Sequence, residues 1–251
     1  MGIAEHMLWG WPLLAALGGT VMAGIIRGYT GFGAALVQAP IYALLFTPAE
    51  AVMLVTFMGT LASAQMFPIV RRHVQWPQVA GVTVGAWVCI PLGTLLLISV
   101  DAEVMRRAIS LIVLVVALVL LSGWRWRGRQ TTWSAVAAGG VSGVINGAAG
   151  TGGPPVVLYW LSGGNTAEVA RANLTTYYAF LNLGTWVALL VAGAVLPTIL
   201  WNILILMPTF SLALWLGNRL FLLGSDRLYR YLALGFLVAL ALVTLVLPGR
   251  G

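Results

Sequence analysis

Long runs of apolar residues, separated by short breaks that carry Pro, Gly or charge, fill almost the whole chain. A helix needs about 20 apolar residues to cross the hydrocarbon core of a bilayer, and most of the runs approach that length. The runs are Met7–Ile26, Gly31–Phe46, Ala49–Val70, Val79–Val100, Ala108–Trp124, Trp133–Ala149, Pro155–Ser162, Leu174–Leu196, Ile199–Leu216 and Leu228–Leu247. This pattern predicts an all-α integral membrane protein with about eight spanning helices.

Two of the runs are too short to span a bilayer as straight helices. Gly31–Phe46 and Pro155–Ser162 each follow a cluster of glycines and each contain Pro. The hydrocarbon core is about 30 Å thick, and neither run crosses it comfortably. We therefore expect each to be a half-helix or the returning arm of a broken, re-entrant Gly/Pro hairpin.

Composition narrows the class of protein further. Hydrophobic residues make up 61% of the 251 residues and charged residues 8%, which excludes an ordinary soluble enzyme and a disordered chain. The 13 basic residues, all Arg, outweigh six acids and give a net charge of +7. In a membrane protein such a surplus indicates cytoplasmic loops, so the expected partner is the lipid bilayer and not nucleic acid.

The arginines also predict an orientation. The positive-inside bias places three loops in the cytoplasm, those with Arg71–Arg72, Arg125–Arg129 and Arg219–Arg230. The neutral loop Asp101–Arg107 fits outside. Each short run and the long run before it must then form a pair that enters and leaves on the same side of the membrane. Counting the remaining crossings from the cytoplasmic loops predicts that the N- and C-termini are periplasmic. The first run lacks a basic leader, so we interpret it as a retained segment.

An internal duplication supports the same plan. A shift of 119 residues aligns Gly24–Val37 with Gly143–Val156, and six of these 14 positions are identical. We infer an N-terminal repeat (1–124), a cytoplasmic linker (125–132) and a C-terminal repeat (133–251) within one membrane domain. Each half makes an odd number of crossings, which predicts inverted topology. Inverted repeats with broken segments at matching positions are typical of secondary transporters, whose substrate sits near the midplane.

The paired glycine clusters are the main candidates for a binding site. Gly lets the backbone leave helical geometry, and a helix that starts inside the membrane directs N–H groups and a positive dipole end into a cavity. The candidates from the two breaks are Gly28, Thr30, Gly31, Gly33, Gly147, Gly150, Thr151, Gly152, Gly153 and Pro154. Helix packing is the alternative for the upstream glycines, because Gly24 and Gly28, and likewise Gly143 and Gly147, follow small-xxx-small spacing.

Several polar side chains add to this candidate site. Arg27 suits an oxyanion through its forked donors, unless it snorkels to an interface, and its duplicate position holds Asn146. Arg171 either pairs with Glu168 three residues earlier or guards an access path. Asn173 and Tyr177 belong to a polar run in which back-bonding to helix carbonyls is the alternative. Gln38 is a lesser candidate.

Other functional classes lack the residues that they need. The two histidines, His6 and His73, lie at run ends, and no cluster of Cys, His or carboxylates falls inside a run. We therefore predict no enzyme activity, no catalytic residues, no metal site and no cofactor. An anion channel would use the same dipoles and arginines, and it stays the alternative to a transporter. Saturable flux with counterflow would exclude the channel.

The two Gly-rich breaks carry a resemblance to a known family. Gly28-x-x-Gly31-x-Gly33 followed by Pro40, and Gly147-x-x-Gly150-x-Gly152-Gly153-Pro154-Pro155 in the other half, resemble the sulfite exporter TauE/SafE family over nearly the whole chain. The resemblance implies transport of sulfite, an organosulfonate or a related small anion across the bacterial inner membrane. The chain departs from the family pattern at Ala34, Ala35 and the double Pro. Export, import, the coupling ion and a homodimer stay open.

Overall fold

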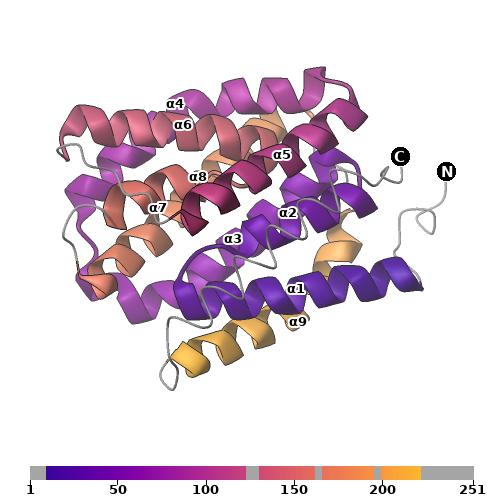
Figure 1. The fold of residues 1–251 in the computed structure, drawn as a ribbon, viewed down its shortest axis with the longest axis horizontal. Helices are drawn as coiled ribbons and strands as arrows, with labels where there is room; N and C mark the ends of the chain where they lie inside the picture. The colour runs from indigo at the N-terminus through magenta and orange to yellow at the C-terminus, as the bar shows by residue number, and fades with distance from the viewer. Residues whose placement is uncertain (1–9, 123–129, 162–165, 195–198, 222–251) are drawn as a thin grey trace.

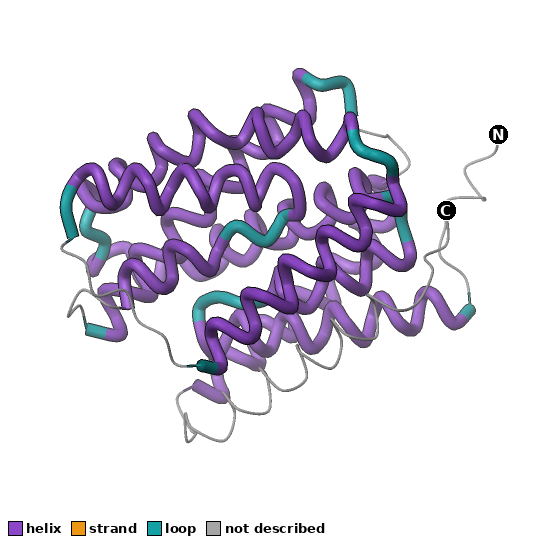
Figure 2. The backbone as a smooth tube through the Cα atoms, turned by 45° about the horizontal axis from the view of Figure 1, so that its top comes forward, coloured by secondary structure: helices purple, strands orange, loops and turns teal. Residues whose placement is uncertain are grey.

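The chain folds into a bundle of helices (Figures 1 and 2). The computed structural model describes residues 10–122, 130–161, 166–194 and 199–221, and within these ranges all regular structure is helical, which confirms the predicted class. The elements are α1 (Trp11–Thr30), α2 (Ala34–Leu45), α3 (Pro48–Val70), the 3₁₀ turn η2 (Arg71–His73), α4 (Trp76–Ser99), α5 (Ala102–Leu121), α6 (Thr132–Ala149), α7 (Gly153–Leu161), α8 (Ala167–Val191) and α9 (Ile199–Phe221).

Five described helices are long and apolar enough to cross a membrane: α1, α3 with η2, α4, α8 and α9. The protein is thus a multi-pass membrane protein, while the expected total of about eight spans stays a prediction. The run Leu228–Leu247, the arginines of the linker and both termini lie outside the described residues.

Both predicted breaks are present as glycine turns between a long helix and a short one. Gly31 and Gly33 have φ values of +80° and +91°, and Gly150 has a φ of +68°. These left-handed conformations favour glycine because a Cβ atom would clash with the backbone. Each break ends a helix of 18 residues or more and starts a helix of 12 or 9 residues.

The charged segment predicted as a loop after α4 instead forms the first turns of α5. The Asp101 carboxylate accepts hydrogen bonds from the backbone N–H groups of Glu103 (2.9 Å) and Val104 (3.3 Å) and so caps the helix. Arg106 is only 4% exposed. Its Nε donates to the carbonyl of Ala43 in the last turn of α2 at 2.6 Å. A cation at this end of α2 complements the helix dipole.

The long helix after the second break also begins earlier than predicted. Thr166 caps α8, its hydroxyl accepting from the N–H of Val169 at 3.4 Å, so the helix starts at Ala167 instead of Leu174. The polar run 173–178 therefore lies in the second to fourth turns of α8. This placement turns its side chains toward neighbouring helices, and Tyr177 and Asn173 are both buried.

Two parallel helix pairs, α4 with α6 and α1 with α9, form opposite edges of the bundle (Figure 1). A Cβ atom on Gly147 would meet the Ile90 carbonyl and, at 2.8 Å, the Thr94 nitrogen; one on Gly28 would meet the carbonyl of Leu214 and, at 2.7 Å, the nitrogen of Asn218. Gly28 and Gly147 are 119 residues apart, and the residues that they contact, Leu214 and Ile90 or Asn218 and Thr94, are 124 residues apart. The same close crossing thus recurs in both pairs, as small-xxx-small spacing predicts.

We expect Gly143→Val to destabilise the protein strongly, because its side chain would enter the backbone of α4 at Ala86. Overpacking of this kind costs about 1–3 kcal/mol or more. Gly18→Val is the matched control, since nothing lies within 4 Å of a Cβ atom at Gly18. Thermal unfolding in detergent should show a lower midpoint for the first variant alone, and equal midpoints would contradict this packing.

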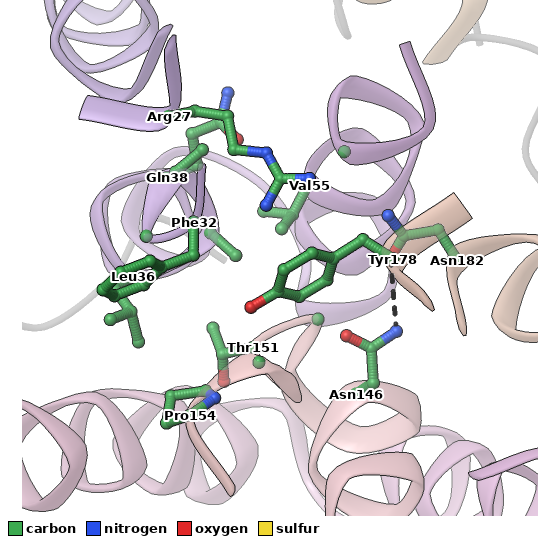
Figure 3. A pocket seen from close by; sticks show the side chains of 16 residues that line it. Arg27, Phe32, Leu36, Gln38, Val55, Asn146, Thr151, Pro154, Tyr178 and Asn182 are labelled. Atoms are coloured by element: carbon green, nitrogen blue, oxygen red, sulfur yellow. Dashed lines mark hydrogen bonds between the residues drawn. The ribbon is translucent and has the colours of Figure 1, made fainter. Parts of the chain in front are cut away.

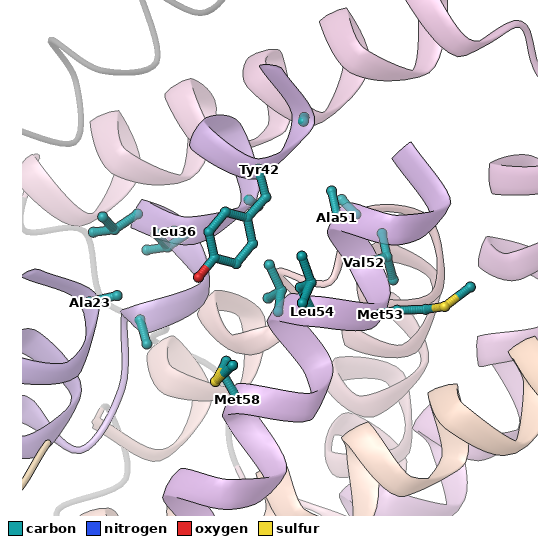
Figure 4. Packing of buried hydrophobic residues seen from close by; sticks show 14 of the residues in the cluster. Ala23, Leu36, Tyr42, Ala51, Val52, Met53, Leu54 and Met58 are labelled. Atoms are coloured by element: carbon teal, nitrogen blue, oxygen red, sulfur yellow. The ribbon is translucent and has the colours of Figure 1, made fainter. Parts of the chain in front are cut away.

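Helices α3 and α8 cross the centre of the bundle in opposite directions. Phe57 stacks edge-on against Trp186 at 6.1 Å between ring centroids, and Gly59 lies against Asn182. The short α2 is fixed beside them by a buried apolar cluster around Tyr42 (Figure 4). The Tyr42 hydroxyl lies 2.7 Å from the hydroxyl of Thr20 on α1. The start of α2, which follows the first break, is therefore held in a defined place.

Candidate anion site

A small cavity lies between the two helix breaks (Figure 3). Its volume is about 30 Å³, which is room for roughly two water molecules. It is lined by Arg27, Phe32, Gly33, Ala34, Ala35, Leu36, Gln38, Val55, Gly59, Asn146, Gly150, Thr151, Gly153, Pro154, Tyr178 and Asn182. Both predicted breaks thus contribute to one cavity.

Arg27 is a buried cation on this cavity. Its side chain is 3% exposed, its Nη2 donates to the Ser63 hydroxyl at 3.3 Å, and its Cζ lies 4.3 Å from the ring centroid of Tyr178. Its Nε has no hydrogen-bond partner within the described ranges. Both ion pairs found there involve Glu103 of α5, so no described carboxylate neutralises Arg27.

Asn146 holds the matching position on the second break. Its Oδ1 accepts from the N–H of Gly152 at 3.1 Å, and its Nδ2 donates to the Thr185 hydroxyl at 2.8 Å. Its Nδ2 also lies 3.5 Å from Oδ1 of Asn182. A shift of 119 residues converts Arg27 and Ser63 into Asn146 and Asn182. The same link between a broken helix and a central helix therefore occurs on both sides of the cavity, with a cation on one side.

Two further polar atoms on the cavity wall have no hydrogen-bond partner among the described residues: the hydroxyl of Thr151 and Oε1 of Gln38. Both side chains are 0% exposed. Buried polar groups are nearly always hydrogen-bonded, and each exception calls for an explanation. Together with Nε of Arg27, these atoms give the cavity three buried polar atoms without a described hydrogen-bond partner.

The two short helices meet the cavity with different chemistry. The start of α2, at Ala34, Ala35 and Leu36, lines the cavity, and no side chain caps it, although the N–H of Leu36 donates to the Gly33 carbonyl at 3.1 Å. The first N–H groups of a helix lack intrahelical acceptors and attract anions. Helix α7 instead begins Gly153-Pro154-Pro155, and proline has no N–H. The sequence predicts an anion between two equivalent helix ends, whereas the backbone donors are concentrated at α2.

Half of the predicted site residues lie away from the cavity. Thr30 closes the first break by donating to the Phe32 carbonyl at 2.6 Å, and the Asn173 amide accepts from the Gln75 N–H at 2.8 Å. Tyr177 donates to Ser142 at 2.6 Å. The others that do not line it are Gly28, Gly31, Gly147, Gly152 and Arg171. Their predicted part in substrate binding stays a prediction.

Sequence reasoning missed Phe32, Ala34, Ala35, Leu36, Val55, Gly59 and Asn182, and it considered Tyr178 only as part of the polar run 173–178. The internal duplication could have pointed to some of these residues. Its shift pairs Tyr178 with Gly59, and both line the cavity. It also pairs Asn182 with Ser63, which does not line the cavity but accepts a hydrogen bond from Arg27. Tyr178 is the largest of these side chains, and its ring lies between Arg27 and the second break (Figure 3).

A sequence profile described as "Sulfite exporter TauE/SafE" matches residues 15–244. The chain belongs to the TauE/SafE family. The matched segment contains both breaks and every residue that lines the cavity. Membership of TauE/SafE implies a membrane exporter of sulfite or a related anion, which is consistent with the expectation that the protein is not an enzyme. No curated protein and no solved structure gives a significant match.

Proposed function

We propose that the protein is a secondary transporter that moves a small oxyanion, sulfite or an organosulfonate, across the bacterial inner membrane. The observation that carries this proposal is Arg27, a buried cation without a described carboxylate partner, on a cavity between two helix breaks. A buried charge is costly unless something pairs with it. A substrate anion supplies the missing partner.

The donors around the cavity fit an oxyanion with several oxygens. The Arg27 guanidinium offers forked N–H groups, the Thr151 hydroxyl offers a single donor, and the start of α2 offers backbone N–H groups with a favourable dipole. Tyr178 covers one face of Arg27 and excludes water from it. Exclusion of water strengthens these electrostatic contacts. The closed cavity has room for about two water molecules, so a larger anion binds only when the cavity walls move apart.

Alternating access needs two halves that move against each other, and the packing supports an inverted repeat of 1–124 and 133–251. Equivalent helices α3 and α8 run antiparallel, which is the relation that a two-fold axis in the membrane plane produces. The parallel pairs α1 with α9 and α4 with α6 agree with the crossing count from the arginines. In this proposal both termini are periplasmic and the substrate sits near the axis. A homodimer stays a prediction.

Transport by purified protein in proteoliposomes tests the proposal. We expect saturable uptake of radiolabelled sulfite and acceleration by unlabelled sulfite on the opposite side, because a carrier exchanges substrate across the membrane. Ethanesulfonate and chloride serve as competitors that separate an oxyanion site from a general anion path. Flux that does not saturate and shows no counterflow would favour the anion channel, and absence of any sulfite or sulfonate flux would contradict the proposed substrate class.

A further inference from the structure

Arg171 ties three helices together just outside the cavity. It lies in the second turn of α8, and its Nη2 donates to the carbonyl of Gly28 on α1 at 2.9 Å and to Oδ1 of Asn218 on α9 at 2.8 Å. The stem of the side chain fills the space beside Gly31, where a Cβ atom would lie 2.8 Å from Cγ of Arg171. One guanidinium thus connects the central helix to the first break and to the edge pair α1 and α9.

The equivalent place on the other side of the cavity has valine instead of arginine. The shift of 119 residues converts Arg171 into Val52, Gly31 into Gly150 and Gly28 into Gly147. A Cβ atom on Gly150 would lie 3.2 Å from Cγ1 of Val55 and 3.7 Å from Cα of Val52. Thr94 takes the place of Asn218, and its buried hydroxyl has no hydrogen-bond partner within the described ranges. Val52 has no polar atom in its side chain with which to bond it.

We propose that Arg171 is a latch that closes one of the two access paths to the cavity, while the opposite path is closed by apolar contact alone. This inference rests on the proposed alternating-access function. Opening the path beside Gly31 separates α8 from α1 and α9, and so breaks the hydrogen bonds from Arg171 to Gly28 and Asn218. Among the described residues, opening the path beside Gly150 breaks van der Waals contacts at Val52 and Val55, whose side chains form no hydrogen bond. The two paths therefore open with different ease, although the backbone around them is duplicated.

In the open state, Arg171 also lies on the path that the substrate follows between the cavity and the membrane surface. A guanidinium released from Gly28 and Asn218 is a cation beside the first break, and it attracts an oxyanion that leaves Arg27. An anion in that path competes with the Gly28 carbonyl for the same donors. Under the orientation proposed above, α8 begins on the cytoplasmic side, so Arg171 closes the cytoplasmic path.

Reporter cysteines at equivalent positions test the latch without any substrate. In a Cys89→Ala background, Thr30→Cys reports on the Arg171 side and Ala149→Cys on the Val52 side, because these positions are 119 residues apart. Protein in nanodiscs, open to a maleimide reagent from both faces, is labelled with and without Arg171→Val. We expect Arg171→Val to accelerate labelling at position 30 by about tenfold or more, as two hydrogen bonds to a charged group are lost. Labelling at position 149 should stay within about twofold.

Further variants distinguish opening of the latch from general unfolding of the protein. Arg171→Lys keeps the charge and Asn218→Ala removes one of the two acceptors, so both should accelerate labelling at position 30 by less than Arg171→Val. Val52→Ala should act on position 149 instead. Unchanged labelling at position 30, or an equal rise at both positions, would overturn the latch. A failed sulfite transport assay would not overturn the latch, because cysteine labelling needs no anion. Failure of the proposed function and failure of the latch are therefore distinguishable.

Discussion

Arg27→Met should weaken sulfite binding by about 100-fold or more and abolish measurable transport. Hydrogen bonds to charged groups contribute about 1.5–3 kcal/mol each, and a guanidinium that grips an oxyanion makes at least two. Met preserves much of the apolar stem, so its contact with the Tyr178 ring is partly kept. Isothermal titration with sulfite measures the affinity, and counterflow in proteoliposomes measures transport.

Two comparisons show whether the effect comes from the site. Arg27→Lys retains the charge but loses the forked geometry, and we expect an intermediate affinity. Arg107→Met removes an exposed arginine that pairs with Glu103 on α5, away from the cavity, and should leave affinity unchanged. Wild-type affinity in Arg27→Met would remove this residue from the binding site.

Asn146→Asp should weaken anion binding on the order of 100-fold, while leaving the fold intact. The new carboxylate has the size of the amide and still accepts from the Gly152 N–H, and the Thr185 hydroxyl can donate to it. It places a negative charge on the cavity that holds Arg27, where it both repels an anion and competes for the guanidinium. Titration with sulfite against pH gives a direct test, because protonation of the carboxylate should restore affinity.

The matched control is Asn173→Asp, which makes the same chemical change outside the cavity. Asn173 bonds Gln75, the residue that precedes α4, and does not line the cavity. We expect sulfite affinity within about twofold of wild type for this variant. A comparable loss of affinity in both variants would show a general effect of added negative charge and would contradict a specific place for Asn146.

Hydrophobic pattern alone was enough for the helical class and for the positions of both breaks. The length of the apolar runs determines the helical class, and the clustered glycines determine where the helices break, so both features depend on local sequence. The start of α5 was predicted wrongly because Glu103, Arg106 and Arg107 look like a loop. Their charges are accommodated instead by the Asp101 cap, by ion pairs and by a bond from Arg106 to the Ala43 carbonyl on α2. That bond depends on tertiary packing, which a local pattern does not contain.

The site was predictable as a pair of segments but not as a set of side chains. Arg27, Asn146 and Thr151 were found because the breaks are duplicated. Tyr178 and Asn182 lie on α8, a helix that reaches the cavity only because it crosses α3 at the centre of the bundle. Conversely, Asn173 and Tyr177 precede Tyr178 in the same polar run, yet they face Gln75 and Ser142. Which face of α8 meets the cavity is decided by helix packing.

In the proposed transporter, the prolines that open α7 give the two halves different parts in substrate recognition. The charge and the backbone donors for an anion would come from Arg27 and the start of α2, whereas the other half would offer the neutral Thr151 hydroxyl and the surfaces of Pro154 and Tyr178. Recognition of the anionic group and selection of the group attached to it are therefore separable. In this proposal a smaller residue at Pro154, which does not contact Arg27 through its ring as Tyr178 does, admits a bulkier sulfonate without weakening the grip on its charged end.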